Sequence, residues 1–271
     1  MLRTRIITAL LLLAVLLVVL KLGFVAFAIF AGIFFAAAAW ETLRLFHSKN
    51  PIVGAVIWTV LFALFLLQDR SGNMNFLFAL CVAIWVFRLV PSLSVGLPSL
   101  EGIGNRLLGA VYGLAVLGSF LAAVMFYRQS ASYLFSVLVL VWIADVGAYF
   151  FGKAFGKRKL APSISPGKSW EGAIGGGFAV IAAAVAMAAV PMFGDTFAAQ
   201  IQNAWGWFGL VVAMTVIVAA SVTGDLFESQ LKRRAGMKDS SGLLPGHGGV
   251  LDRVDALIPV LPLAMLIHAR I

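Results

Sequence analysis

The sequence predicts an all-α polytopic integral membrane protein with about nine transmembrane helices. Hydrophobic residues make up 62% of the 271 residues and charged residues only 11%, against about 45–50% and about 25% in soluble domains. The mean hydropathy is +1.03. Because a soluble fold of this length cannot bury so much apolar surface, the composition excludes a water-soluble enzyme and a disordered chain. Cys81 is the single cysteine, which excludes a disulfide-stapled secreted scaffold.

The apolar runs are long enough to cross a bilayer, since a spanning helix needs about 20 apolar residues at 1.5 Å each. The predicted spans lie near residues 4–20, 23–40, 52–67, 75–90, 107–127, 132–151, 172–192, 204–222 and 250–268. Only Lys21 and Gly23 separate the first two spans. Arg3 and Arg5 before the first span also resemble the start of a secretory signal, so removal of that span is an alternative that leaves the orientation of the others unchanged.

The positive charges predict a cytoplasmic N-terminus and a C-terminus outside. In that orientation only four of the 20 Lys and Arg residues lie outside, namely Lys21, Arg70, Arg128 and Arg270. Such an excess of cytoplasmic cations follows the positive-inside rule. Contact with anionic lipid headgroups explains the net charge of +9, so no nucleic-acid partner is expected.

Two long polar segments, residues 152–171 and 223–249, both fall on the predicted cytoplasmic side. Long charged loops between closely spaced helices are where function is usually placed. We therefore divide the chain into residues 1–130, with about five helices and no recognisable site motif, and residues 131–271, with about four helices and both polar segments. The active site is predicted in the second part, facing the cytoplasm.

The second polar segment places a carboxylate, a hydroxyl and two cations at helical spacing. If the eighth predicted helix continues beyond Gly224, then Asp225, Ser229, Lys232 and Arg233 share one face. Such a stripe could hold a metal ion and the phosphates that it bridges. A solvated helix with ion pairs between successive turns is the alternative.

Glycines around His247 let backbone N–H groups approach a ligand closely, and a predicted helix begins just after them. Asp252 and Asp255 lie in its first turn, where helix capping explains one carboxylate more easily than two. Magnesium prefers one or two carboxylates completed by water and phosphate oxygens, so Asp225 and Asp252 are candidate magnesium ligands. A lone histidine such as His247 can equally be a hydrogen-bonded structural residue.

The first polar segment contains Gly167-Lys168-Ser169, which resembles part of a phosphate-binding loop. The Walker pattern fails because Pro162 stands where a glycine is required and no strand is predicted before it. Lys168 can still bind phosphate as a point charge. Asp145 is the only acid inside a predicted span, about 9 Å from its end, and such acids are functional candidates unless they bond a neighbouring helix.

Two groups of residues resemble the signature of the phosphatidate cytidylyltransferase family, also called CDP-diacylglycerol synthases. The first group is Ser229–Arg233, Lys238–Asp239 and Pro245–Asp255. The second group is Asp145–Tyr149, Gly152, Gly156–Lys157 and Ser165–Gly172. The resemblance therefore lies in the C-terminal half of the chain.

The resemblance implies transfer of CMP from CTP to phosphatidate, giving CDP-diacylglycerol and pyrophosphate in phospholipid biosynthesis. It implies a site at the cytoplasmic face of the cytoplasmic (inner) membrane, in contact with the lipid bilayer, and a homodimer. It places Mg²⁺ on Asp225 and Asp252, as one ion or two, and phosphate on Ser229, Lys232 and Arg233. We add Lys168, His247 and Asp145 as substrate-binding candidates. A CTP-dependent lipid kinase and a transporter are the alternatives.

Overall fold

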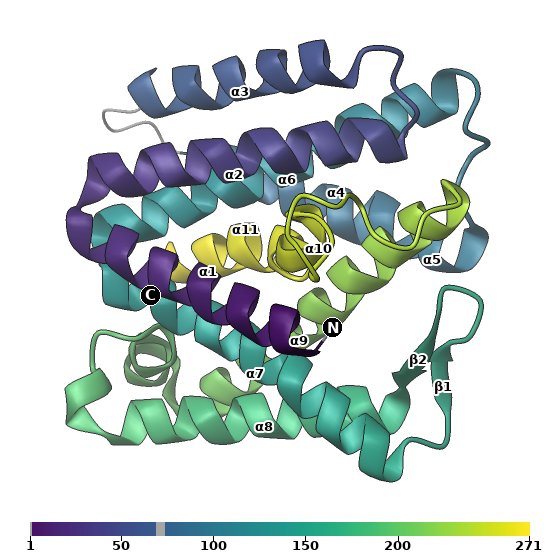
Figure 1. Ribbon diagram of the computed structural model, residues 1–271. Helices are drawn as coiled ribbons and strands as arrows, with labels where there is room; N and C mark the ends of the chain where they lie inside the picture. Colours follow the sequence, from purple (N-terminus) through teal and green to yellow (C-terminus); the bar gives the residue numbers. More distant parts are fainter. Residues whose placement is uncertain (1, 69–73) are drawn as a thin grey trace.

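The computed structural model describes residues 2–68 and 74–271 (Figure 1). The helices are α1 (Leu2–Leu22), α2 (Phe24–Leu45), α3 (Pro51–Gln68), α4 (Asn75–Ile84), the π-helical turn η1 (Trp85–Leu89), α5 (Val90–Val95), α6 (Ile103–Gln129), α7 (Ala131–Phe155), α8 (Trp170–Ala189), the 3₁₀ turn η2 (Pro191–Phe193), α9 (Phe197–Arg234), α10 (Leu251–Val254) and α11 (Leu257–His268). The strands β1 (Lys159–Ala161) and β2 (Ser165–Ser169) form one antiparallel hairpin.

The described residues contain seven helical stretches that are long and apolar enough to cross a membrane. Two shorter apolar helices, Ile6–Leu22 and Leu257–His268, complete the set. Each of these stretches overlaps one predicted span, which confirms the all-α polytopic fold. Three of the cations used to orient the chain cannot be compared, because Arg70 and the side chains of Arg3 and Arg5 lie outside the described part.

Two spans differ from their predicted bounds. Helix α9 runs from Phe197 to Arg234, well beyond the predicted 204–222, and bends at Gly206, whose φ is 70°. The last predicted span, 250–268, is broken into α10 and α11. The break keeps Asp252, Arg253 and Asp255 out of the continuous apolar helix, where a charge at full depth is costly.

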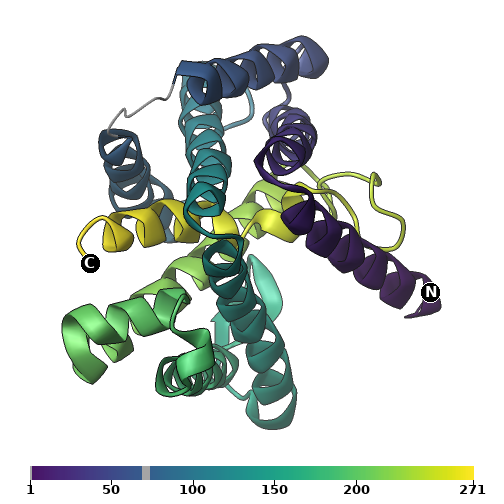
Figure 2. The same ribbon diagram turned by 90° about the vertical axis from the view of Figure 1, so that its left-hand side faces the viewer.

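Helix α6 is the centre of the bundle and contacts α2, α3, α4, α7 and α11. Its most apolar stretch is two-thirds buried, more than that of any other long helix. In Figure 2 the other helices radiate from this axis. Helices α7 and α8 pack through glycines: a Cβ on Gly176 would meet the Ala144 carbonyl, and one on Gly172 would meet the Ala148 carbonyl. Small residues four apart commonly let membrane helices approach this closely.

The two polar segments fold differently from each other. Residues 159–169 form the β1–β2 hairpin, with Lys159 opposite Ser169, and it projects from the bundle at the end of α7 (Figure 1). These two strands were not predicted from the sequence. The segment after α9 instead folds back over the bundle and reaches α10, which contacts α2. Helix α2 therefore lies against the start of α10, far away in sequence.

Candidate active site

Asp252 is the best-satisfied acid of the predicted site. It lies in α10 and is only 9% exposed. Its Oδ2 accepts hydrogen bonds from the Ser240 amide at 2.8 Å, the Ser240 hydroxyl at 2.8 Å and the Gly249 amide at 2.7 Å. Burial raises the pKa of this carboxyl, but the Lys232 ammonium and these hydrogen bonds outweigh burial and hold the pKa below its usual value. Asp252 is therefore ionised at neutral pH.

Lys232 joins Asp252 to a second acid. Its Nζ donates to Asp252 Oδ1 at 2.6 Å and forms an ion pair with Glu228, one turn earlier on α9. Glu228 is fully buried. The ammonium thus bridges two carboxylates and offsets part of the free-energy cost of burying them.

Asp225 stands in a more open position on the same helix. Its carboxylate forms an ion pair with Lys168 of β2 and accepts a hydrogen bond from Ser229 Oγ at 3.3 Å. The Asp225 side chain is 31% exposed and the Lys168 side chain 27% exposed. The hairpin therefore brings the lysine predicted to bind phosphate onto the aspartate predicted to bind metal.

Asp145 and Asp255 connect these two groups. Asp145 lies within electrostatic range of Asp225, Lys168 and Arg253. Asp255 lies within range of Asp225, Asp145 and Lys232. The structure thus gathers acids from α7, α9 and the α10–α11 turn, together with two lysines, into one charged cluster.

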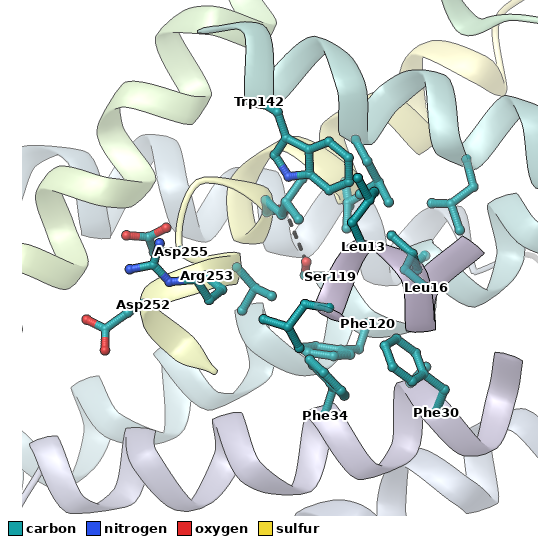
Figure 3. Close-up of a pocket in the computed structure, with 18 of the residues that line it drawn as sticks. Leu13, Leu16, Phe30, Phe34, Ser119, Phe120, Trp142, Asp252, Arg253 and Asp255 are labelled. Atoms are coloured by element: carbon teal, nitrogen blue, oxygen red, sulfur yellow. Dashed lines mark hydrogen bonds between the residues drawn. The ribbon is translucent and has the colours of Figure 1, made fainter. Parts of the chain in front are cut away.

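A cavity of about 450 Å³ opens beside this cluster. Most of its wall is apolar and comes from α1, α2, α6 and α7, including Leu13, Phe30, Phe120 and Trp142. Figure 3 shows these side chains at one end and Asp252, Arg253 and Asp255 at the other. Asp145 and His247 also line it. The cavity therefore joins an apolar compartment to a charged one.

A second, polar cavity of about 510 Å³ lies along the segment after α9. Its lining includes Lys238, Asp239, Ser241, His247 and Arg253. His247 and Arg253 line both cavities. The Nδ1 atom of His247 is buried and has no hydrogen-bond partner among the described residues, so it is free to bond a ligand.

The predicted stripe on α9 is only partly brought together. Ser229 bonds Asp225 as its spacing indicated. Lys232 points instead to Glu228 and Asp252, and Arg233 is exposed to solvent. The two candidate cation-binding aspartates thus belong to neighbouring parts of the cluster, each already paired with a lysine.

The carboxylate oxygens of Asp225 and Asp252 fit part of a magnesium coordination shell. No group of three or more His, Cys, Asp and Glu side chains that could hold a metal ion was found in residues 2–68 and 74–271. Asp225 and Asp252 each direct an oxygen at a lysine ammonium, which stands where a cation would neutralise the carboxylate. A magnesium ion there would complete its coordination with water and substrate phosphate.

Sequence reasoning assigned no role to Glu41, Glu228 or Ser240. Glu228 and Ser240 contact Lys232 and Asp252 of this cluster, and Glu41 accepts a hydrogen bond from the Val250 amide beside it. Both glutamates lie inside spanning helices that the sequence bounded too narrowly, so Asp145 is not the only acid within such a helix. The available signal was the scarcity of acids, which number only 11 in the chain.

Comparison with known proteins covers almost the whole chain. The sequence model described as "Cytidylyltransferase family" matches residues 3–270. The phosphatidate cytidylyltransferase of Haemophilus influenzae is 37% identical over 284 residues, covering 97% of this chain and 96% of the relative. That of Pseudomonas aeruginosa is 39% identical over 290 residues, covering 97% and 95%. That of Staphylococcus aureus is 33% identical over 265 residues, covering 96% of each chain.

Proposed function

Because the chain belongs to the cytidylyltransferase family, we propose that it transfers CMP from CTP to phosphatidate, producing CDP-diacylglycerol and pyrophosphate. The observation that carries this proposal is the cavity whose apolar wall ends at the charged cluster. Phosphatidate has the same division, with acyl chains at one end and a phosphate at the other. A soluble nucleotide alone would not need the apolar part.

The lipid would place its acyl chains along Leu13, Phe30 and Phe120, since burying apolar surface there is favourable. Its phosphate would then lie near Arg253 and His247. The polar cavity shares these two residues and would receive the CTP phosphates from the other side. The two anionic substrates would thus meet where cations reduce their mutual repulsion.

The reaction requires no protein nucleophile. An oxygen of the lipid phosphate attacks the α-phosphorus of CTP, the new P–O bond forms, and the bond from the α-phosphorus to the bridging oxygen breaks. Pyrophosphate leaves with that electron pair. The second pKa of a phosphate monoester is about 6, so the attacking oxygen is already ionised at neutral pH. Lys168 and Arg253 would stabilise charge on the reacting phosphates.

Magnesium would be held by Asp225 and Asp252, with Ser229 beside the first. The ion supplies Lewis-acid stabilisation of the phosphate oxygens when it is bound. Asp225 suits this task because it is partly exposed and, among the described residues, pairs only with Lys168 and Ser229. Lys232, which Glu228 holds in place through their ion pair, would keep Asp252 ionised and oriented. These proposed reacting groups all lie in residues 131–271.

We also propose the cytoplasmic (inner) membrane as the location, with the site facing the cytoplasm. The excess of positive charge in the two polar segments supports this orientation. A homodimer is expected from the family resemblance, and cross-linking in membranes followed by mass measurement tests it.

The decisive experiment uses purified protein, phosphatidate, Mg²⁺ and CTP labelled at either the α- or the γ-phosphorus. We expect α-label in the lipid and γ-label in pyrophosphate. Lipid labelled only from the γ-position would instead identify a lipid kinase, and solute transport without nucleotide consumption would identify a transporter. Chelation of divalent ions should stop lipid labelling, and added Mg²⁺ should restore it.

A further inference from the structure

Glu41 is a fully buried carboxylate in the part of the chain that carries no site motif. It lies near the C-terminal end of α2. Its Oε1 accepts a hydrogen bond from the Val250 amide at 3.0 Å, and its Oε2 accepts one from the Leu251 amide at 2.6 Å. The Ser241 hydroxyl also donates to Oε1. One side chain of the N-terminal half therefore holds both ends of the segment between Ser241 and Leu251.

The arrangement requires an acceptor with two oxygens. The first amides of a helix have no partner within it, and here Glu41 satisfies those of Val250 and Leu251 at the start of α10. A carboxylate accepts all three hydrogen bonds, whereas a carboxamide of the same shape offers one oxygen and turns N–H groups toward donors. A buried donor left without an acceptor is destabilising.

The segment held by Glu41 is the one that orients Asp252. Leu251 is the neighbour of Asp252, and the Gly249 amide donates to Asp252 Oδ2 at 2.7 Å. The backbone at Gly249 is so close to Glu41 that a Cβ there would collide with Glu41 Oε1 and Ser240 Oγ. Glu41 and Asp252 thus both accept hydrogen bonds from the backbone amides of residues 249–251.

We propose that Glu41 is a positioning residue for cytidylyl transfer, acting through the Ser241–Leu251 backbone to set the position of Asp252. This inference rests on the proposed function for its kinetic consequence. Glu41 is not among the residues that line either cavity of the site. Its loss should therefore change turnover rather than the affinity for phosphatidate.

The test compares Glu41→Gln and Glu41→Asp with the wild-type protein. Glu41→Gln should lower kcat by about 10- to 100-fold, the range typical of residues that orient a metal-ligating group through hydrogen bonds. The KM for phosphatidate should stay within about twofold, because the apolar wall is unchanged. Glu41→Asp keeps a carboxylate, so its kcat should lie between the other two values.

Thr42→Val is the matched control. Thr42 is adjacent on α2 and as deeply buried, and its hydroxyl has no recorded partner among the described residues. This variant should keep the wild-type kcat. A double-mutant cycle with Ser241→Ala adds a second check: if both residues act through the same segment, Glu41→Gln and Ser241→Ala together should cost less than the product of their separate effects.

Amide hydrogen exchange provides a readout that does not depend on activity. Glu41→Gln should speed exchange at Val250 and Leu251, while Thr42→Val should not. Unchanged exchange with unchanged kcat in Glu41→Gln would overturn the inference. If Glu41→Gln fails to fold, Glu41→Asp and Ser241→Ala decide, and wild-type kcat in both would overturn it. Absence of CMP transfer by the wild-type protein would instead refute the proposed function, and the exchange result would still judge the positioning role.

Discussion

The α9–α10 loop (residues 235–250) and the α7–α8 hairpin (residues 156–169) both bring charge to the site, but they are held in different ways. The loop is fixed by buried carboxylates of Glu41 and Asp252, which accept its backbone N–H groups. The hairpin is fixed by its own strand pairing, and its contact with the cluster is made by Lys168. Charge thus holds the loop in place, whereas in the hairpin we propose that it serves substrate binding.

The largest effect should come from Asp252→Asn, because this carboxylate both fixes the loop and is a proposed magnesium ligand. The amide cannot replace the ionic hydrogen bond of Lys232, and it leaves Ser240 and Gly249 with a poorer acceptor. We expect activity to fall to background. The free energy of unfolding should decrease by roughly 3–5 kcal/mol, as when one partner of a buried ion pair is removed. Activity assays and thermal melts in detergent measure both. A wild-type melting temperature would show that the loop does not depend on this carboxylate.

Asp225→Asn should be nearly as severe for activity but mild for stability. Asp225 is partly exposed, and its recorded partners are Lys168 and Ser229. Turnover should fall by about 100-fold or more if the carboxylate holds magnesium. The melting temperature should change little. Comparison with Asp252→Asn in the same assay separates a loss of turnover from a loss of stability. Near-normal turnover would remove Asp225 from the proposed metal site.

Lys168→Met should have a smaller, binding-type effect. The methionine keeps most of the length of the side chain and removes only the charge near Asp225. Loss of one charge-assisted contact to phosphate should raise the KM for one substrate by about tenfold, with a smaller change in kcat. Steady-state kinetics with each substrate varied in turn would show which one. If the KM of the variant for each substrate equals the wild-type value, Lys168 serves only as a structural ion pair.

The smallest effect should come from Glu171→Gln, which tests the hairpin alone. Its carboxylate accepts hydrogen bonds from the Lys157 and Arg158 amides at 3.0 and 3.1 Å on the surface. Because the strands stay paired and Ser169 still caps α8, activity should change by less than about twofold. A large loss would show that the hairpin, like the loop, depends on a carboxylate for its position.

Hydrophobic run lengths were sufficient to predict the helical framework, because a bilayer requires each crossing to be long and apolar. The motif around Asp252 also indicated which segments form the site. Spacing along one helix was less informative: Lys232 shares a face with Asp225 in sequence, yet it bonds Asp252 from another element. Charge pairing across elements depends on tertiary packing, which no local pattern contains.

The role of Glu41 could not be predicted from its local sequence either. Nothing near it in sequence resembles a site, and its partners lie about 200 positions away in the chain. The hairpin was missed for a different reason. Its strands are only three and five residues long, and β2 contains a proline and a glycine, which are depleted in strands.

Helix α1 has a practical consequence for work with this protein. Leu12, Leu13 and Leu16 line the cavity, and the Thr8 hydroxyl donates to the Pro245 carbonyl at 2.9 Å. A change that disturbs α1 would therefore alter one wall of the proposed substrate compartment. The other end of the chain, marked C in Figure 1, lines neither of the two cavities of the site, so attachment after Ile271 is the safer design for purification and imaging.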